Sequence, residues 1–328
     1  MIYPLVTIVI PSYNAQSFIG GCLESILCQT YQNLEIVVVD DGSVDETSKV
    51  VKSYSDPRLR LYELPNRGAG AARNSGFSEA RGEFIQYLDA DDLLHPNKLE
   101  EQIKATDRSS YDSTLYAATF WHFSASLQDA VERRLEIYHL PNPVDFLTCS
   151  WLGGGFIQTG GWLIPRKLHE KAGEWSEWPV NPNDDGEFFT RVLLKSKEIV
   201  YCKDAIFYYR LPRPDSLASQ RSRIAAEALL WTLVSSATEL LRCENTPRTV
   251  AACRANISRF VFEVLPSFPD LAVAAENFIK DAGGNALTNL DFDNSGMVGF
   301  VQKFLGWRRA RFIQFRYRAM LTGGASRL

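Results

Sequence analysis

The sequence lacks several features that would assign it to large classes of protein. No apolar run reaches about 18 residues, so a transmembrane helix is not expected. Residues 1–14 contain neither a basic segment nor a cleavage site and lead directly into a strand pattern, so we expect mature protein and no signal peptide. The six cysteines form no CxxC pair and no metal-ligand spacing, which favours reduced, structural cysteines in a cytoplasmic protein.

Acidic residues are missing from one end of the chain. From Asn294 onward there are seven basic side chains and no acidic one, whereas residues 1–293 carry 28 basic and 39 acidic side chains, a net charge of −11. The acidic balance of the whole chain, −4, argues against nucleic acid as a partner. In the tail, KFLGWRRARFIQFRYRAML, arginines alternate with aromatic residues. This pattern predicts either peripheral contact of residues 301–328 with anionic lipid, at the inner face of the membrane, or a packed helix with its basic face in water.

Strand and helix patterns alternate through the first hundred residues. Short apolar runs predict four strands, at residues 5–10, 36–39, 59–64 and 83–88. The segments between them predict three helices, at residues 15–29, 43–54 and 68–80. We expect the second helix to begin with a capping box of Ser43 and Glu46. The alternation predicts an α/β fold, with a mostly parallel sheet flanked by helices.

The two parts of the chain differ in their patterns. Helical periodicity dominates after the mixed pattern of the first two thirds. We therefore predict one α/β domain over residues 1–215 and a helical C-terminal region, with the basic aromatic tail, over residues 216–328.

Three polar turns follow strands of the predicted sheet: PSYN (11–14), DDGS (40–43) and DADD (89–92). Parallel strands end at one edge of a sheet, where ligands bind, so we expect the three turns to meet. Asp89 and Asp91 are two residues apart and point to the same side of an extended chain. Such a carboxylate pair suits Mg²⁺ or Mn²⁺ held together with a substrate diphosphate. The alternatives are a Ca²⁺ loop, for which the EF-hand pattern is absent, and helix capping by Asp92.

Three further polar sites each allow a functional and a structural interpretation. Asp40 and Asp41 could bind a nucleobase or ribose, or could favour a helix N-terminus electrostatically. Arg73 stands in NRGAGAARN where a GxGxxG motif has its third glycine, and could pair with phosphate, with an acidic turn, or with a surface carboxylate. In NDDGEFFTRV (183–192), a carboxylate could act as a general base or simply begin a helix.

Taken in order, these motifs resemble the family 2 glycosyltransferases with the GT-A fold. The matching segments, from about residue 4 to 219, are VTIVIPSYNAQSFIGGCLESILCQTYQNLEIVVVDDGS, NRGAGAARNSGF, FIQYLDADD, NDDGEFFTRV and YYRLPRPDSLAS. The resemblance implies an inverting transfer of a sugar from a nucleotide-diphosphate sugar, with a UDP-sugar favoured, and dependence on Mn²⁺ or Mg²⁺. It also implies a saccharide or lipid-linked acceptor in the synthesis of polysaccharide, lipopolysaccharide or another glycoconjugate.

The same resemblance assigns roles to individual residues. By position, the nucleobase, ribose and phosphates would be held by Pro11, Tyr13, Asp40, Asp41 and Arg73. Asp89 and Asp91 match the DxD motif, with Asp91 the direct metal ligand.

Two matches depart from the family pattern. Asp185 matches the general base, but Asp184 precedes it where the family has glutamate, so both are candidates. Arg210 matches a position near the donor diphosphate, with Leu211 in place of the usual histidine. Two other functions stay open: a catalytically silent sugar-nucleotide-binding or scaffold protein, and a nucleotidyltransferase, for which the expected glycine-rich, lysine-bearing loop is missing.

Overall fold

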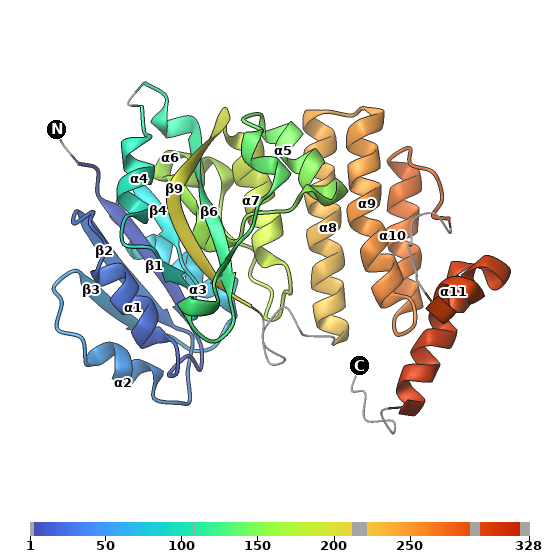
Figure 1. Ribbon diagram of the computed structural model, residues 1–328, viewed down its shortest axis with the longest axis horizontal. Coiled ribbons are helices and arrows are strands. Elements are labelled where there is room, and N and C mark those ends of the chain that lie inside the picture. The colour runs from blue at the N-terminus through green and yellow to red at the C-terminus, as the bar shows by residue number, and fades with distance from the viewer. Residues whose placement is uncertain (1–2, 108, 212–221, 289–295, 322–328) are drawn as a thin grey trace. The chain divides into compact units, whose positions relative to one another are not determined.

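The computed structural model in Figure 1 describes residues 3–107, 109–211, 222–288 and 296–321. The chain divides into two compact units. The sheet unit consists of Met1–Ser150, Gly154–Pro179 and Asp184–Ser216, and the helical unit of Trp151–Gly153, Val180–Asn183 and Leu217–Leu328. The sequence did not indicate that two short internal segments group with the helical unit. The division into functional domains at residues 1–215 and 216–328 stays a prediction.

The sheet unit is built on a nine-stranded sheet with the order β3-β2-β1-β4-β8-β6-β9-β5, and β7 pairs with β6. Its strands are β1 (Val6–Ser12), β2 (Leu34–Asp40), β3 (Leu59–Glu63), β4 (Phe84–Tyr87), β5 (Leu93–Leu94), β6 (Thr114–Phe123), β7 (Val131–Glu132), β8 (Trp162–Pro165) and β9 (Glu198–Arg210). β1 to β4 pair in parallel, as the sequence predicts. β6 and β9 also pair in parallel, whereas β8 is antiparallel to both β4 and β6, so the sheet is mostly parallel, as predicted, but mixed.

The described part of the sheet unit contains seven α-helices: α1 (Ile19–Leu27), α2 (Thr47–Lys52), α3 (Ala69–Glu79), α4 (Lys98–Lys104), α5 (Pro143–Cys149), α6 (Arg166–Ala172) and α7 (Asp184–Lys195). The predicted capping box of Ser43 and Glu46 is wrong. The N–H of Thr47, at the start of α2, donates instead to Oδ1 of Asp45 at 3.0 Å. The hydroxyl of Ser43 accepts a hydrogen bond from the N–H of Asn14 at 2.9 Å, which ties two turns together.

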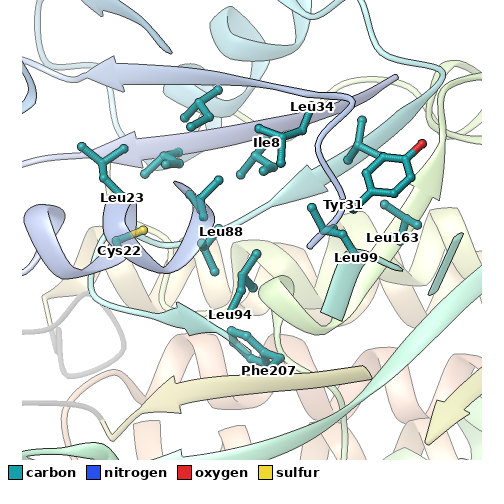
Figure 2. Packing of buried hydrophobic residues seen from close by; sticks show 14 of the residues in the cluster. Ile8, Cys22, Leu23, Tyr31, Leu34, Leu88, Leu94, Leu99, Leu163 and Phe207 are labelled. Atoms are coloured by element: carbon teal, nitrogen blue, oxygen red, sulfur yellow. The ribbon is translucent and has the colours of Figure 1, made fainter. Parts of the chain in front are cut away.

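The central strands are buried on both faces, which explains why their sequences are continuous apolar runs. On one face, Ile8 of β1 packs in a cluster with Cys22 and Leu23 of α1 and with Leu88 (Figure 2). On the other face α3 packs on β1 and β2, and a Cβ added to Gly76 would come within 2.3 Å of Val9. Glycine and alanine in α3 therefore permit a close approach to the sheet. This packing fixes the edge where the parallel strands end.

The helical unit contains α8 (Arg223–Cys243), α9 (Pro247–Val264), α10 (Pro269–Asp281) and α11 (Gly296–Leu321). The first three lie side by side, and α11 is kinked at Gly306, where φ is 77° (Figure 1). Of the described helices, α8 is the one with the length and apolar composition to cross a membrane. A helix buried in a protein core meets the same criteria, and Ala228, Leu233 and Leu240 of α8 are buried. The finding alone therefore assigns no membrane span.

Candidate active site

The three polar turns meet at the carboxyl edge of β1, β2 and β4, as predicted from the sequence. The N–H of Asp41 donates to the carbonyl of Ser12 at 2.8 Å, and the N–H of Leu88 donates to the carbonyl of Val9 at 3.0 Å. Oδ1 of Asn14 accepts a hydrogen bond from the N–H of Val44 at 3.0 Å, so the first two turns interlock. The site residues contributed by these turns thus share one edge of the sheet.

Both carboxylates of the second turn are buried and accept hydrogen bonds from backbone N–H groups nearby. Asp40 accepts hydrogen bonds from the N–H of Ser43 (2.9 Å) and the hydroxyl of Ser48, and Asp41 accepts from the N–H groups of Arg67 and Gly68 (both 2.8 Å). Burial raises the pKa of Asp41, although these two hydrogen bonds oppose the shift. In the first turn, by contrast, Tyr13 is 53% exposed and Pro11 is half-buried. Nucleotide contacts by these residues stay predictions.

Arg73 connects two acidic parts of the site. Its guanidinium is buried, and Nη2 donates to Oδ1 of Asp89 at 2.9 Å while Nη1 donates to Oδ2 of Asp184 at 2.5 Å. Burial alone would lower the pKa of Arg73, but the carboxylates of Asp184 and Asp89 outweigh it and raise that pKa. Of the roles considered from the sequence, the structure therefore shows Arg73 paired with the acidic turn.

Trp175 is part of the site although no sequence motif indicated it. Its ring stacks on the Arg73 guanidinium, with Cζ 4.4 Å from the ring centroid, and on Phe188 of α7, with centroids 4.0 Å apart. Asn74, the next residue in α3, accepts from the N–H of Trp175 at 2.8 Å and donates to its carbonyl at 2.9 Å. Trp175 thus helps to fix Arg73 against the first turn of α7.

Asp184 and Asp185, at the start of α7, have different surroundings. Asp184 is buried and accepts hydrogen bonds from Arg73 and from the N–H of Asp185 at 2.8 Å. Asp185 is half-buried, and its Oδ1 accepts from the N–H of Gly186 at 2.9 Å. Burial, followed by repulsion from Asp184, raises the pKa of Asp185 to about 7, although Arg73 acts in the opposite direction. A carboxyl with this pKa can exchange a proton near neutral pH.

The acidic turn DADD also divides into residues with different surroundings. Oδ1 of Asp92 accepts a hydrogen bond from the N–H of Arg210 at 2.8 Å, and Asp92 is fully buried. Its pKa is raised well above the usual range by burial and then by Asp91. The guanidinium of Arg210 donates to the carbonyls of Asp91 and Ser124, both at 3.0 Å. Asp92 and Arg210 therefore hold the turn on β9, while Asp89 and Asp91 are only partly buried.

The carboxylates of the DADD turn suit a divalent cation that binds together with a phosphate, rather than one held by protein side chains alone. Within the described ranges, no three His, Cys, Asp or Glu side chains form a group that could hold a metal ion. Mg²⁺ and Mn²⁺ at phosphate sites commonly take one or two carboxylates, with waters and phosphate oxygens completing the shell. Asp89 and Asp91 fit this arrangement chemically, since hard oxygen donors stand two residues apart at the end of β4.

Comparison with solved structures defines the fold class. The chain superposes on residues 1–349 of Staphylococcus aureus TarS, in complex with UDP-GlcNAc, with a TM-score of 0.72 and 16% identity, covering 95% of this chain and 91% of that fragment. It also superposes on the Pyrobaculum calidifontis mannosyltransferase PcManGT (complex with GDP-Man and Mn²⁺) with a TM-score of 0.55 and 19% identity, covering 100% of this chain and 89% of that protein. The sheet and its flanking helices thus have the GT-A fold of glycosyltransferases.

The sequence comparison narrows the class to a family. Residues 7–171, half of the chain, match the family described as "Glycosyl transferase family 2", and this chain belongs to that family. An uncharacterized glycosyltransferase of Rickettsia felis is 41% identical over 181 residues, which are 53% of this chain and 29% of the relative. The chain spans about a third or less of the length of the first curated relatives that it matches. The resemblance recognised from the motifs is confirmed.

Proposed function

We propose that this protein is an inverting glycosyltransferase that moves a sugar from a nucleotide-diphosphate sugar to an acceptor hydroxyl. A UDP-sugar is the favoured donor. The acceptor is a saccharide or a lipid-linked saccharide in the synthesis of polysaccharide, lipopolysaccharide or another glycoconjugate. The protein would act in the cytoplasm or at the inner face of the membrane. Membership of the family supports the reaction class, and the binding of nucleotide sugars by TarS and PcManGT supports the donor class.

The observation that carries the proposal is the environment of Asp185. An acceptor hydroxyl must lose its proton as it attacks the anomeric carbon, and a base whose pKa is near the working pH performs this step efficiently. Asp185, with its pKa raised to about 7, fits that task, whereas Asp184 is held by Arg73. We therefore assign proton removal to Asp185 and the positioning of the first turn of α7 to Asp184.

The remaining residues would hold the donor. Asp91, as the direct ligand, and Asp89 would bind Mn²⁺ or Mg²⁺, which would neutralise charge on the departing diphosphate. Tyr13 presents its exposed ring for contact with the nucleotide, and Asp40 and Asp41 hold the turn beside it. One displacement at the anomeric carbon inverts its configuration, so a single catalytic carboxylate is enough.

A panel of UDP-, GDP- and dTDP-sugars, screened for thermal stabilisation with and without Mn²⁺, identifies the donor. With that donor, we expect wild-type protein to release nucleoside diphosphate slowly and Asp185→Asn to bind the donor but not to turn it over. Asp184→Asn controls for loss of a neighbouring carboxylate and should retain measurable turnover. Failure of the whole panel to stabilise or react would overturn the proposal, and full activity of Asp185→Asn would overturn the assignment of the base.

A further inference from the structure

The second half of α11, after the kink at Gly306, has one face packed against α9 and α10 of the helical unit. Trp307 and Ala310 are buried. Arg308 forms an ion pair with Glu276 of α10, and Nε of Arg311 donates to the carbonyl of Phe262 of α9 at 2.9 Å. These contacts fix the rotation of the helix about its axis and so decide which side chains face outward.

The opposite side of this helix combines apolar and basic side chains. We call it the outer face, and it consists of Arg309, Phe312, Ile313, Arg316 and Tyr317. The first four are spaced three and four residues apart, so they lie together on one side of a helix. Phe312 is 40% exposed, Ile313 46% and Tyr317 57%.

Charge on the outer face is of one sign. α11 contains no Asp or Glu in its 26 residues. Whereas Arg308 is paired with Glu276, neither Arg309 nor Arg316 forms an ion pair with a carboxylate of the described residues. Exposed apolar side chains and arginines without an ion-pair partner among the described residues therefore share one side of this helix.

We propose that the outer face of α11 binds an anionic lipid surface. The apolar side chains can enter the boundary between headgroups and acyl chains, while the arginines reach anionic headgroups with their long side chains. A second copy of this chain suits the face less well, since a two-fold interface would bring its arginines close to one another. Nucleic acid is disfavoured by the acidic balance of the whole chain. Lipid binding by this face does not depend on the transfer reaction.

The test is co-sedimentation of the full chain with vesicles. We expect binding to phosphatidylcholine vesicles that contain about one third phosphatidylglycerol, little binding to phosphatidylcholine alone, and weaker binding as the salt rises from about 0.1 M to about 0.5 M. Arg309→Gln with Arg316→Gln should lower the partition constant on the order of 25-fold, about fivefold for each arginine. Phe312→Ser with Ile313→Ser should lower it about tenfold or more.

A matched control removes two positive charges elsewhere. Lys171 and Lys195 are exposed residues of α6 and α7, and the Lys171→Gln, Lys195→Gln variant should bind vesicles as the wild type does. Unchanged thermal unfolding and donor turnover of all variants show that the fold and the active site are intact. Three results would overturn the proposal: no vesicle binding by wild type, equal loss in the lysine control, or a monomer–dimer shift on Phe312→Ser, Ile313→Ser without a change in vesicle binding.

Discussion

Nη1 of Arg73 lies 2.5 Å from Oδ2 of Asp184, and this ion pair joins segments 111 residues apart in the sequence. Because Nη2 of the same guanidinium binds Asp89 at 2.9 Å, one side chain links the DADD turn to the first turn of α7. The proposed metal ligands and the proposed base are therefore held relative to each other by a buried cation.

Replacing Arg73 by methionine should be costly for both stability and turnover. The change leaves the buried carboxylate of Asp184 without its cation, and loss of one partner of a buried pair costs about 3–5 kcal/mol. We expect about a hundredfold lower turnover, because α7 and the DADD turn lose their link. Arg73→Lys should recover only part of both losses, since an ammonium group lacks the planar fork that reaches two carboxylates.

Urea unfolding and donor turnover measure these effects. The control is Lys52→Met, which breaks an ion pair of 2.6 Å whose two side chains are 56% and 52% exposed. Such a pair contributes less than about 1 kcal/mol. If Arg73→Met and Lys52→Met lowered stability equally, the central role of Arg73 would be wrong.

The raised pKa of Asp185 predicts a specific pH dependence of stability. The folded protein holds a proton on Asp185 up to about pH 7, whereas the unfolded chain releases it near the usual value of 3.8. Between about pH 4 and pH 7 the folded state therefore binds more protons than the unfolded state. The free energy of unfolding falls as the pH rises through this range, because Asp185 must then lose its proton in a partly buried site. Asp185→Asn removes this titration, so the variant should equal the wild type near pH 4 and be more stable above pH 7.

Thermal unfolding of both proteins across that pH range gives the difference directly. Asp45→Asn is a control of opposite sign, because hydrogen bonds from Thr47 outweigh burial and lower the pKa of Asp45. Asp45→Asn should therefore lower the free energy of unfolding above about pH 4 and have little effect below that pH. A difference between Asp185→Asn and wild type that does not change with pH would contradict the assignment.

Asp91 and Asp92 should respond differently to the same substitution. Asp92 is buried, with its pKa well above the usual range, and an asparagine oxygen can still accept the hydrogen bond from the N–H of Arg210. We therefore expect less than about a twofold change in Mn²⁺ affinity for Asp92→Asn, and a loss of about tenfold or more for Asp91→Asn. Titration of Mn²⁺ by electron paramagnetic resonance, with UDP present, measures both. Equal losses in the two variants would argue against Asp91 as the direct ligand.

Much of the sheet edge was predictable from the sequence because its determinants are local. Strand periodicity, the rule that parallel strands end at one edge, and the turns PSYN, DDGS and DADD together place the acidic residues correctly. The sequence also indicates that Asp89 and Asp92 have different surroundings, because side chains three residues apart in an extended segment point to opposite sides.

Other parts of the site could not be predicted because they depend on contacts between distant segments. Trp175 stacks on Arg73 across a separation of about a hundred residues, and no periodicity or motif marks it. The capping box was wrong because Ser43 binds Asn14 of another turn in place of its own helix. The mixed character of the sheet likewise results from β8 inserting between β4 and β6.

Gly70, in the first turns of α3, gives a direct test of how closely this helix approaches the segment that carries Trp175. A Cβ added at Gly70 would lie 2.1 Å from the carbonyl oxygen of Ser176, and backbone cannot move aside as a side chain can. Gly70→Ala should therefore cost about 1–3 kcal/mol and displace Trp175 from Arg73, lowering turnover.

Gly21→Ala in α1 is the matched control, because its Cβ would meet only Leu93 at 3.8 Å, an ordinary contact. There alanine should stabilise the helix by about 0.5–1 kcal/mol, since it loses less backbone entropy on folding. Urea unfolding measures the free energy of unfolding of both variants. If both were more stable than the wild type, the packing of α3 against Ser176 would be looser than the structure indicates.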